Sequence, residues 1–169
     1  MIVYTLERKQ EIRRTRAEVF DFFSDPINLE RITPAFLRFR IVTQPPIVIQ
    51  AGALLEYRLS LFGIGFGWQT LIEEWNPRES FVDVQLGGPY KLWRHTHTFT
   101  ELAPDTTMMI DRVDYALCGG AFARPGHAMF VAPMLKRIFD YRARTIERLL
   151  EDGGRAGNTR PSIPRVAAG

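Results

Sequence analysis

Six consecutive segments in the middle of the chain show the alternation of apolar and polar residues that is typical of β-strands. They cover residues 37–43, 54–62, 67–76, 80–87, 92–102 and 106–118. Most of the links between them are short and rich in glycine, proline or asparagine, which favours tight turns. Strands joined by such turns pair antiparallel with their neighbours, so this part of the chain is predicted to form a meander.

The segment before the meander predicts one more strand and two short helices. Residues 2–12 alternate in the manner of a half-buried strand. Thr15 and Glu18 have the spacing of a capping box and precede a helix that ends by residue 24. Asp25 and Pro26 are a good N-cap and a tolerated first helical residue, so a second helix runs through about residue 32.

The segment after the meander predicts one long helix. Apolar residues recur there at spacings of three and four: Val131, Leu135, Ile138, Ile146 and Leu149. We expect a helical segment from Phe122 to Glu151. If the helix proper runs from about Pro133 to Asp152, it is about 30 Å long, enough to cross a sheet of ten-residue strands. Two glycines then end it, and the proline-containing residues 153–169 are predicted to be a disordered tail. We expect one domain over residues 1–152.

The composition argues against several classes of protein. The single cysteine among 169 residues, Cys118, excludes an internal disulfide and a cysteine metal cluster, and favours a reducing compartment. The net charge is only +3 and the arginines are scattered, so we expect no nucleic-acid partner. The first residues do not resemble a signal peptide, and no apolar run reaches the roughly 18 residues of a membrane span. We therefore expect a cytoplasmic protein.

The stretch LWRHTHTF, residues 92–99, places two of the three histidines on one face of a strand. Asp83 is expected opposite His95, and Gln85 opposite Trp93. The next hairpin would bring the residues of 111–115 beside the histidines, although a slip by one residue would reverse the faces. We expect Glu73 on this inner surface and predict ligand contacts from Trp75, Asp83, Gln85, Trp93, His95, His97, Phe99, Asp111, Val113 and Tyr115.

So many polar groups on an inner surface predict a hollow interior. A buried charge without a partner costs about 3–5 kcal/mol, against the roughly 5–15 kcal/mol that holds a domain together. The polar groups must therefore pair with one another or face water and ligand in a pocket.

Three roles remain open for the two histidines. With a carboxylate they could bind a divalent metal, but His-x-His without a third ligand at a diagnostic spacing is a weak signal, and we expect no metal and no cofactor. A histidine held by an aspartate is also how a general base is oriented, which makes His95, His97 and Asp111 candidate catalytic residues. The third alternative is polar lining that orders the interior or touches a ligand without chemistry.

Four motifs resemble the START-like superfamily, also called SRPBCC. VFDFFSDPINLERITP at 19–34 is similar to the opening helices of that family, and EEWNP at 73–77, GGPYKLWRHTHTF at 87–99 and DRVDYAL at 111–117 are similar to a bacterial subgroup. The resemblance covers about residues 1–152. It implies an α+β helix-grip fold, in which a curved antiparallel sheet of about seven strands wraps around a long C-terminal helix, with two short helices after the first strand.

The resemblance also implies a ligand cavity between the sheet and the C-terminal helix. Most relatives bind lipids, hormones or polyketides, and a minority catalyse reactions on them. We expect a small, largely apolar partner that is lipid-, polyketide- or aromatic-like, and leave self-association open. The alternative is a lyase similar to the polyketide cyclase/dehydrase proteins, with His95 or His97 as general base, Asp111 or Asp83 as its orienting group and Tyr115 as a proton donor.

Overall fold

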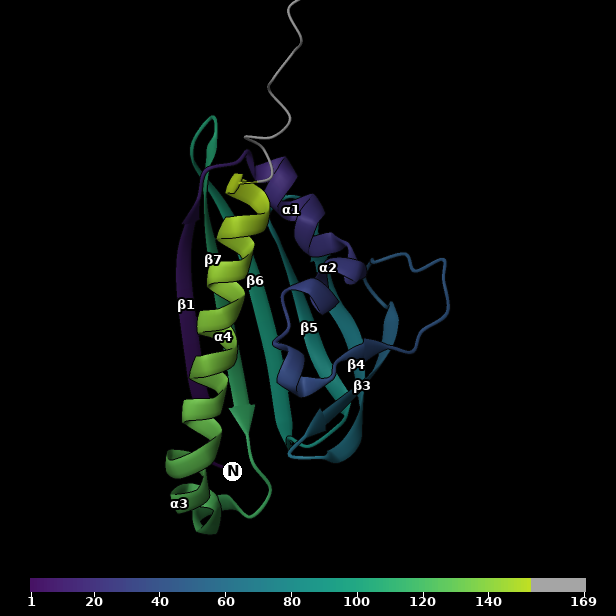
Figure 1. The fold of residues 1–169 in the computed structure, drawn as a ribbon, viewed down its shortest axis with the longest axis vertical. Helices are drawn as coiled ribbons and strands as arrows, with labels where there is room; N and C mark the ends of the chain where they lie inside the picture. Colours follow the sequence, from purple (N-terminus) through teal and green to yellow (C-terminus); the bar gives the residue numbers. More distant parts are fainter. Residues whose placement is uncertain (153–169) are drawn as a thin grey trace, which may run out of the picture.

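The computed structural model describes residues 1–152, which form an antiparallel seven-stranded sheet with helices packed against one face (Figure 1). The order across the sheet is β1-β7-β6-β5-β4-β3-β2, so every strand after β2 lies beside its neighbour in sequence, and β1 closes the far side against β7. The strands are β1 (Tyr4–Ile12), β2 (Arg40–Ile41), β3 (Leu54–Leu61), β4 (Ile64–Asn76), β5 (Ser80–Gly87), β6 (Leu92–Ala103) and β7 (Thr106–Ala116).

Short helices fill the connection between β1 and β2, and a long helical segment follows β7. The first group is α1 (Arg16–Ser24), α2 (Pro26–Arg31) and the 3₁₀ turn η1 (Ala35–Leu37). The second is η2 (Gly120–Ala123), α3 (Arg124–Gly126), the π turn η3 (His127–Val131), α4 (Ala132–Glu147) and the π turn η4 (Arg148–Asp152). Figure 1 shows α4 running along the sheet, which confirms the predicted α+β helix-grip fold. The predicted tail, 153–169, lies outside the described residues.

The start of each short helix agrees with the sequence. The Thr15 hydroxyl accepts a hydrogen bond from the Glu18 amide, and the Glu18 carboxylate accepts one from the Thr15 amide at 3.0 Å. The Asp25 side chain caps α2 by accepting from the Ile27 amide at 2.9 Å. Both caps satisfy amides that the first helical turn leaves without partners.

The predicted register around β6 is confirmed. Asp83 pairs with His95 across β5 and β6, and Asp111 pairs with His97 across β6 and β7. Burial along β6 alternates from Leu92 to Phe99, with both histidines among the buried residues. The histidines therefore point to the face that the helices cover.

The predicted strand at 37–43 is wrong in its extent. Its first residue, Leu37, is the last residue of the 3₁₀ turn η1, and only Arg40 and Ile41 pair with β3. Arg38 adopts a left-handed conformation, with φ of 44°, which breaks the extended backbone. The apolar residues that produced the alternation, Leu37 and Phe39, still pack inward without a strand.

The helical segment begins close to the predicted residue 122, ahead of the long helix α4. It reaches back to Arg124, and Pro133 lies in the first turn of α4, where proline is tolerated. Because Pro133 has no N–H to donate, the α-helical pattern is incomplete there, and the chain takes the wider π turn immediately before it.

An irregularity in β4 corrects the expected position of Glu73. The pairing of β4 with β5 shifts between Ile72 and Glu74, so the alternation of faces is interrupted. Thr70 and Ile72 are buried, whereas Glu73 is exposed and forms an ion pair with Arg94 at 3.0 Å. The bulge therefore puts Glu73 on the outer surface.

The inner face of the sheet packs against the helices in contiguous apolar clusters. One joins Phe20 of α1 and Ile146 of α4 to Phe81 and Phe99 of the sheet. A second joins Leu135 and Phe139 of α4 to β6 and β7. In the part of the chain that the structure describes, no helix is long and apolar enough to cross a membrane.

Replacing Thr15 with Ala is expected to lower the free energy of unfolding by about 1 kcal/mol, because α1 loses its hydroxyl cap. Urea denaturation followed by circular dichroism measures the change. Asp21→Ala, on an exposed position of the same helix, is the control and is expected to have a smaller effect. Equal losses from the two variants would contradict the role of the cap.

Candidate functional site

A cavity of about 440 Å³ lies between the sheet, α2 and α4. Most of its wall is aliphatic and aromatic. That lining comes from Leu29 of α2 and Ile32 directly after it, Leu55, Tyr57 and Leu59 of β3, Trp68 and Ile72 of β4, Trp93 of β6, and Leu135 and Phe139 of α4. The volume falls within the roughly 300–1,000 Å³ of typical small-molecule sites.

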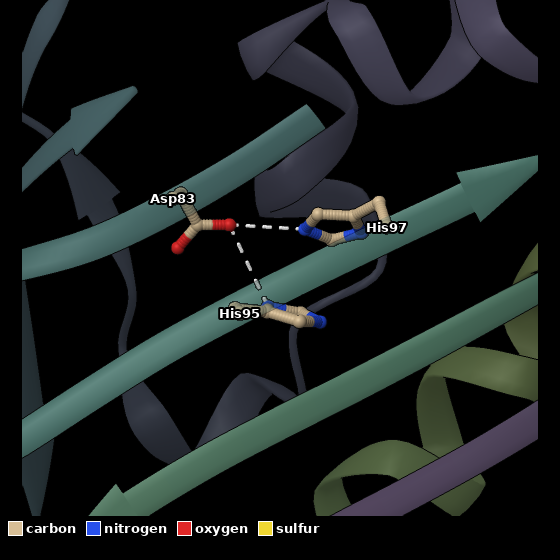
Figure 2. Close-up of side chains that lie close together, drawn as sticks. All are labelled: Asp83, His95 and His97. Carbon is tan, nitrogen blue, oxygen red and sulfur yellow. Dashed lines mark hydrogen bonds and ion pairs between the residues drawn. The ribbon is translucent and has the colours of Figure 1, made fainter. Parts of the chain in front are cut away.

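Four ionisable side chains from three neighbouring strands form a cluster at the cavity wall. Asp83 Oδ2 on β5 lies 2.9 Å from His97 Nε2 and 3.6 Å from His95 Nδ1. Figure 2 shows the Asp83 carboxylate directed toward both imidazoles. On the other side of β6, Asp111 Oδ1 lies 2.9 Å from both His95 Nε2 and His97 Nδ1. Each aspartate therefore contacts the histidine directly opposite it and the one diagonally opposite it, which is the reach expected of antiparallel pairs.

Aromatic rings hold the two imidazoles in place. Phe81 stacks on His97 with ring centroids 4.1 Å apart, and the two imidazole centroids are 3.8 Å apart. Phe139 of α4 meets His95 edge to face at 5.5 Å. These contacts leave little rotational freedom, so the nitrogen positions are fixed by packing as well as by hydrogen bonds.

The carboxylates of the cluster are held in their charged form. Burial opposes the charge on Asp111, but the hydrogen bond from His95 and the close approach of His97 outweigh it and hold the pKa of Asp111 well below its ordinary value. Burial also opposes the charge on Asp83, but the two histidines and Arg142 lower its pKa. Only 18% of the Asp83 side chain is exposed, and it faces the cavity.

The two histidines are shifted in opposite directions. Burial lowers the pKa of His95, and the neighbouring His97 lowers it further. For His97 burial acts in the same direction, but the close approach of Asp111 and Asp83 outweighs it and the pKa is raised. His97 therefore takes up a proton before His95 does.

The hydrogen-bond geometry is consistent with this order. His95 Nε2 donates to Asp111 Oδ1 and His97 Nε2 donates to Asp83 Oδ2, both at 2.9 Å. His97 Nδ1 is buried and lies 2.9 Å from Asp111 Oδ1, but off the direction that a hydrogen bond requires. A proton on that nitrogen would interact with Asp111 mainly through charge.

Asp83, His95 and His97 are also the candidate metal ligands. Their donor atoms lie within 4.8 Å of one another, and two imidazoles with one carboxylate is a donor set that zinc accepts. The same atoms are bonded to one another here, so a metal would have to replace the hydrogen bond between Asp83 and His97. The expectation of no metal stays a prediction.

The predicted ligand contacts divide into two groups. Asp83, Trp93, His95 and His97 line the cavity. The other six lie behind or beside it: Trp75, Phe99, Val113 and Tyr115 in the packed core, Asp111 behind the histidines, and Gln85 bonded to the backbone of Tyr90. Tyr115, the expected proton donor, has its hydroxyl 2.8 Å from His127 Nε2 and lies outside the cavity lining.

Several residues of the cavity wall are not evident from the sequence. The bulge in β4 hid Trp68 and Thr70, because it changes which residues face inward. Arg142 was missed although a signal was present. It lies seven residues after Leu135 and four before Ile146, so it occupies the apolar stripe of α4.

Comparison with known proteins identifies the fold. No family model and no curated protein matches the sequence. Among solved structures, Zhui aromatase/cyclase from Streptomyces sp. R1128 superposes with a TM-score of 0.71 at 12% identity, covering 93% of this chain and 99% of that one. Norcoclaurine synthase from Thalictrum flavum gives 0.66 at 12% identity, with coverages of 90% and 97%. Major latex-like protein 151 from Panax ginseng gives 0.64 at 13% identity, with coverages of 88% and 97%.

These matches extend over almost the whole of each neighbour. The chain therefore shares the helix-grip fold of these neighbours, which is the fold that the resemblance of the sequence motifs implied. Identities of 12–13% establish the shared fold alone. What this chain binds must be argued from its own cavity.

Replacing Asp111 with Asn is expected to lower the free energy of unfolding by about 3–5 kcal/mol near pH 6, because both histidines lose a buried charged partner. The Asp111 contribution exists above its unfolded pKa, near 3.8, and is lost as the pH falls through its lowered folded value. The raised pKa of His97 contributes stability that is present below 6.5 and lost as the pH rises through the folded value. The difference from wild type should thus be largest between about pH 3.8 and 6.5.

Urea denaturation across pH 3 to 9 measures this difference. Asp105→Asn makes the same chemical change at an exposed turn and is the control, with an expected effect within about 0.5 kcal/mol. A loss in Asp111→Asn no larger than in this control would show that the cluster does not depend on the carboxylate.

Proposed function

We propose that the domain of residues 1–152 binds a small, largely apolar molecule, lipid-, polyketide- or aromatic-like, in the cavity between its sheet and α4, and does so in the cytoplasm. The observation that carries the proposal is a cavity of about 440 Å³ with a mainly apolar wall and one ionisable cluster. An apolar wall favours an apolar guest, and a few placed polar groups fix its orientation.

The way the cavity is enclosed also supports a binding role. Its wall takes residues from α2, four strands and α4, so it is a feature of the whole fold. Two of the structurally similar proteins also support a role for the cavity: one is an aromatase/cyclase, and another is a synthase whose structure contains a transition state analogue.

A neutral fluorescent probe tests the proposal. N-phenyl-1-naphthylamine is expected to bind the wild-type protein with an increase in fluorescence. Leu59→Trp adds a large ring to the cavity wall and is expected to weaken binding by about tenfold or more, equivalent to about 1.4 kcal/mol. Fluorescence titration gives both dissociation constants.

Leu86→Trp is the matched control, since Leu86 is exposed and lies outside the cavity lining. Its affinity for the probe should equal that of the wild type. The proposal fails if the probe does not bind, or if the two tryptophan variants bind it equally well. Mass spectrometry of any small molecule that copurifies with the protein would then identify the natural guest.

A second candidate function, catalysis by a cyclase/dehydrase-like lyase, is favoured by the geometry of His95. Its Nε2–H donates to Asp111, which leaves the lone pair on Nδ1. Burial and His97 lower its pKa, so the ring is neutral at physiological pH. A neutral imidazole oriented by a carboxylate at a cavity wall has the properties of a general base.

The base can be tested without the natural substrate by Kemp elimination of 5-nitrobenzisoxazole. The base removes the ring C–H proton, the N–O bond breaks, and a coloured cyanophenolate is released. We expect saturable turnover that rises with pH through an apparent pKa below 6.5. His95→Gln should reduce kcat by about 100-fold or more while the probe still binds.

His127→Gln is the control, because His127 stacks on Tyr4 and lies outside the cavity lining. Its turnover should match the wild type. If His95→Gln is as active as the wild type, His95 is not the base, and the binding proposal is unaffected.

A further inference from the structure

Arg142 is a cation placed on the buried side of α4. It is 8% exposed and lines the cavity. Its neighbours on the same stripe of the helix, Leu135, Phe139 and Ile146, are all buried apolar residues. A guanidinium rarely occupies such a position unless it is paired.

The guanidinium has no polar partner among residues 1–152. Its Nε is buried and makes no hydrogen bond, and the structure records no ion pair for the other nitrogens with any described residue. The contact that it does make is with the ring of Phe139, whose centroid lies 5.4 Å from the guanidinium carbon. An arginine has five N–H donors, and the structure records no hydrogen bond from any of those of Arg142 to a described residue.

Neither carboxylate of the cluster forms an ion pair with Arg142, although the guanidinium is close enough to Asp83 to help lower the pKa of that carboxyl. Asp83 and Asp111 form their ion pairs with His95 and His97. Surface arginines of this protein do find partners: Arg8 pairs with Asp140 at 3.1 Å, and Arg94 pairs with Glu73 and Glu74. The cost of a charge without a contact partner rises with burial, so pairing matters more for Arg142 than for these surface arginines. Arg142 nevertheless forms no ion pair with a described residue.

From this geometry we infer that the guest in the cavity carries a carboxylate, which binds the guanidinium of Arg142 while the apolar body of the guest fills the rest of the space. This inference rests on the proposed binding function and specifies the class of ligand. A planar guanidinium can donate two parallel hydrogen bonds to a carboxylate. A phosphate monoester carries more charge than this single unpaired cation can neutralise, so the wall fits a carboxylate better.

A pair of fluorescent probes that differ in one group tests the inference. 9-Anthracenecarboxylate and 9-anthracenemethanol share the same three-ring body, but only the first is an anion at pH 7.5. The wild-type protein should bind the acid about tenfold more tightly than the alcohol, or better. In Arg142→Met this preference should fall to about one, through loss of affinity for the acid alone.

Arg144→Met makes the same change at an exposed position of α4 and should keep the wild-type preference. Arg142→Lys keeps the charge without the planar fork and should give an intermediate preference. Thermal unfolding of the free proteins tests for a structural role. Arg142→Met should be at least as stable as the wild type, because it removes a buried charge without removing a pair.

The outcomes separate this inference from the proposed function. If both probes bind but the wild type does not prefer the acid, or Arg142→Met retains the preference, the inference is overturned and the binding function stands. If Arg142→Met unfolds well below the wild type in the absence of acid, Arg142 has a structural partner and the inference is also overturned. If neither probe binds the wild type, both proposals fail.

Discussion

The contact between two carboxylates and two imidazoles across β5, β6 and β7 is the constraint on which the interior depends. Asp83 and Asp111 come from the strands on either side of the histidines, so the arrangement requires all three strands in one register. A shift of one residue would turn both histidines to the outer face and leave two carboxylates among aromatic rings. The apolar pattern and the polar pairing therefore select the same alignment, and such agreement favours a single native structure.

This cluster also explains how ionisable groups are accommodated next to a mainly apolar cavity. Each aspartate is close to two imidazoles. The pKa of His97 is raised and that of His95 is lowered, so His97 is the histidine that takes up a proton first. The carboxylates and imidazoles of the cluster thus pair with one another, whereas Arg142 on α4 acts on Asp83 through its charge only and its buried Nε makes no hydrogen bond. The charges on the sheet are thus paired, whereas the guanidinium on α4 has no ion pair. This difference gives the cavity a polarity that could orient a guest.

Much of the fold and the central part of the site followed from the sequence because the signals were local. Alternation in 92–99 and short turns on both sides fixed the register that brings His95 to Asp83 and His97 to Asp111. The predictions failed where a local feature interrupts the alternation of inward and outward residues along a strand. The left-handed Arg38 kept the extended backbone from starting before Arg40, although the alternation begins at Leu37, and the bulge in β4 moved Glu73 outward. An inward-facing residue can line the cavity or be packed in the core, as Val113 is. Which of the two occurs depends on the volume of side chains far away in the sequence and cannot be read from the alternation.

The bulge in β4 has a wider consequence for how such a pocket can change. Residues upstream of it, including Trp68 and Thr70, face inward only because the pleat shifts by one position before Trp75. If a single residue were gained or lost at that point, the side chains of β4 upstream of the bulge would exchange faces. Those that now face the guest would point outward and their neighbours would point inward, while β5, β6 and the helix stayed in place. A single codon inserted or deleted there is thus a route by which descendants of one ancestral gene could come to accept different guests.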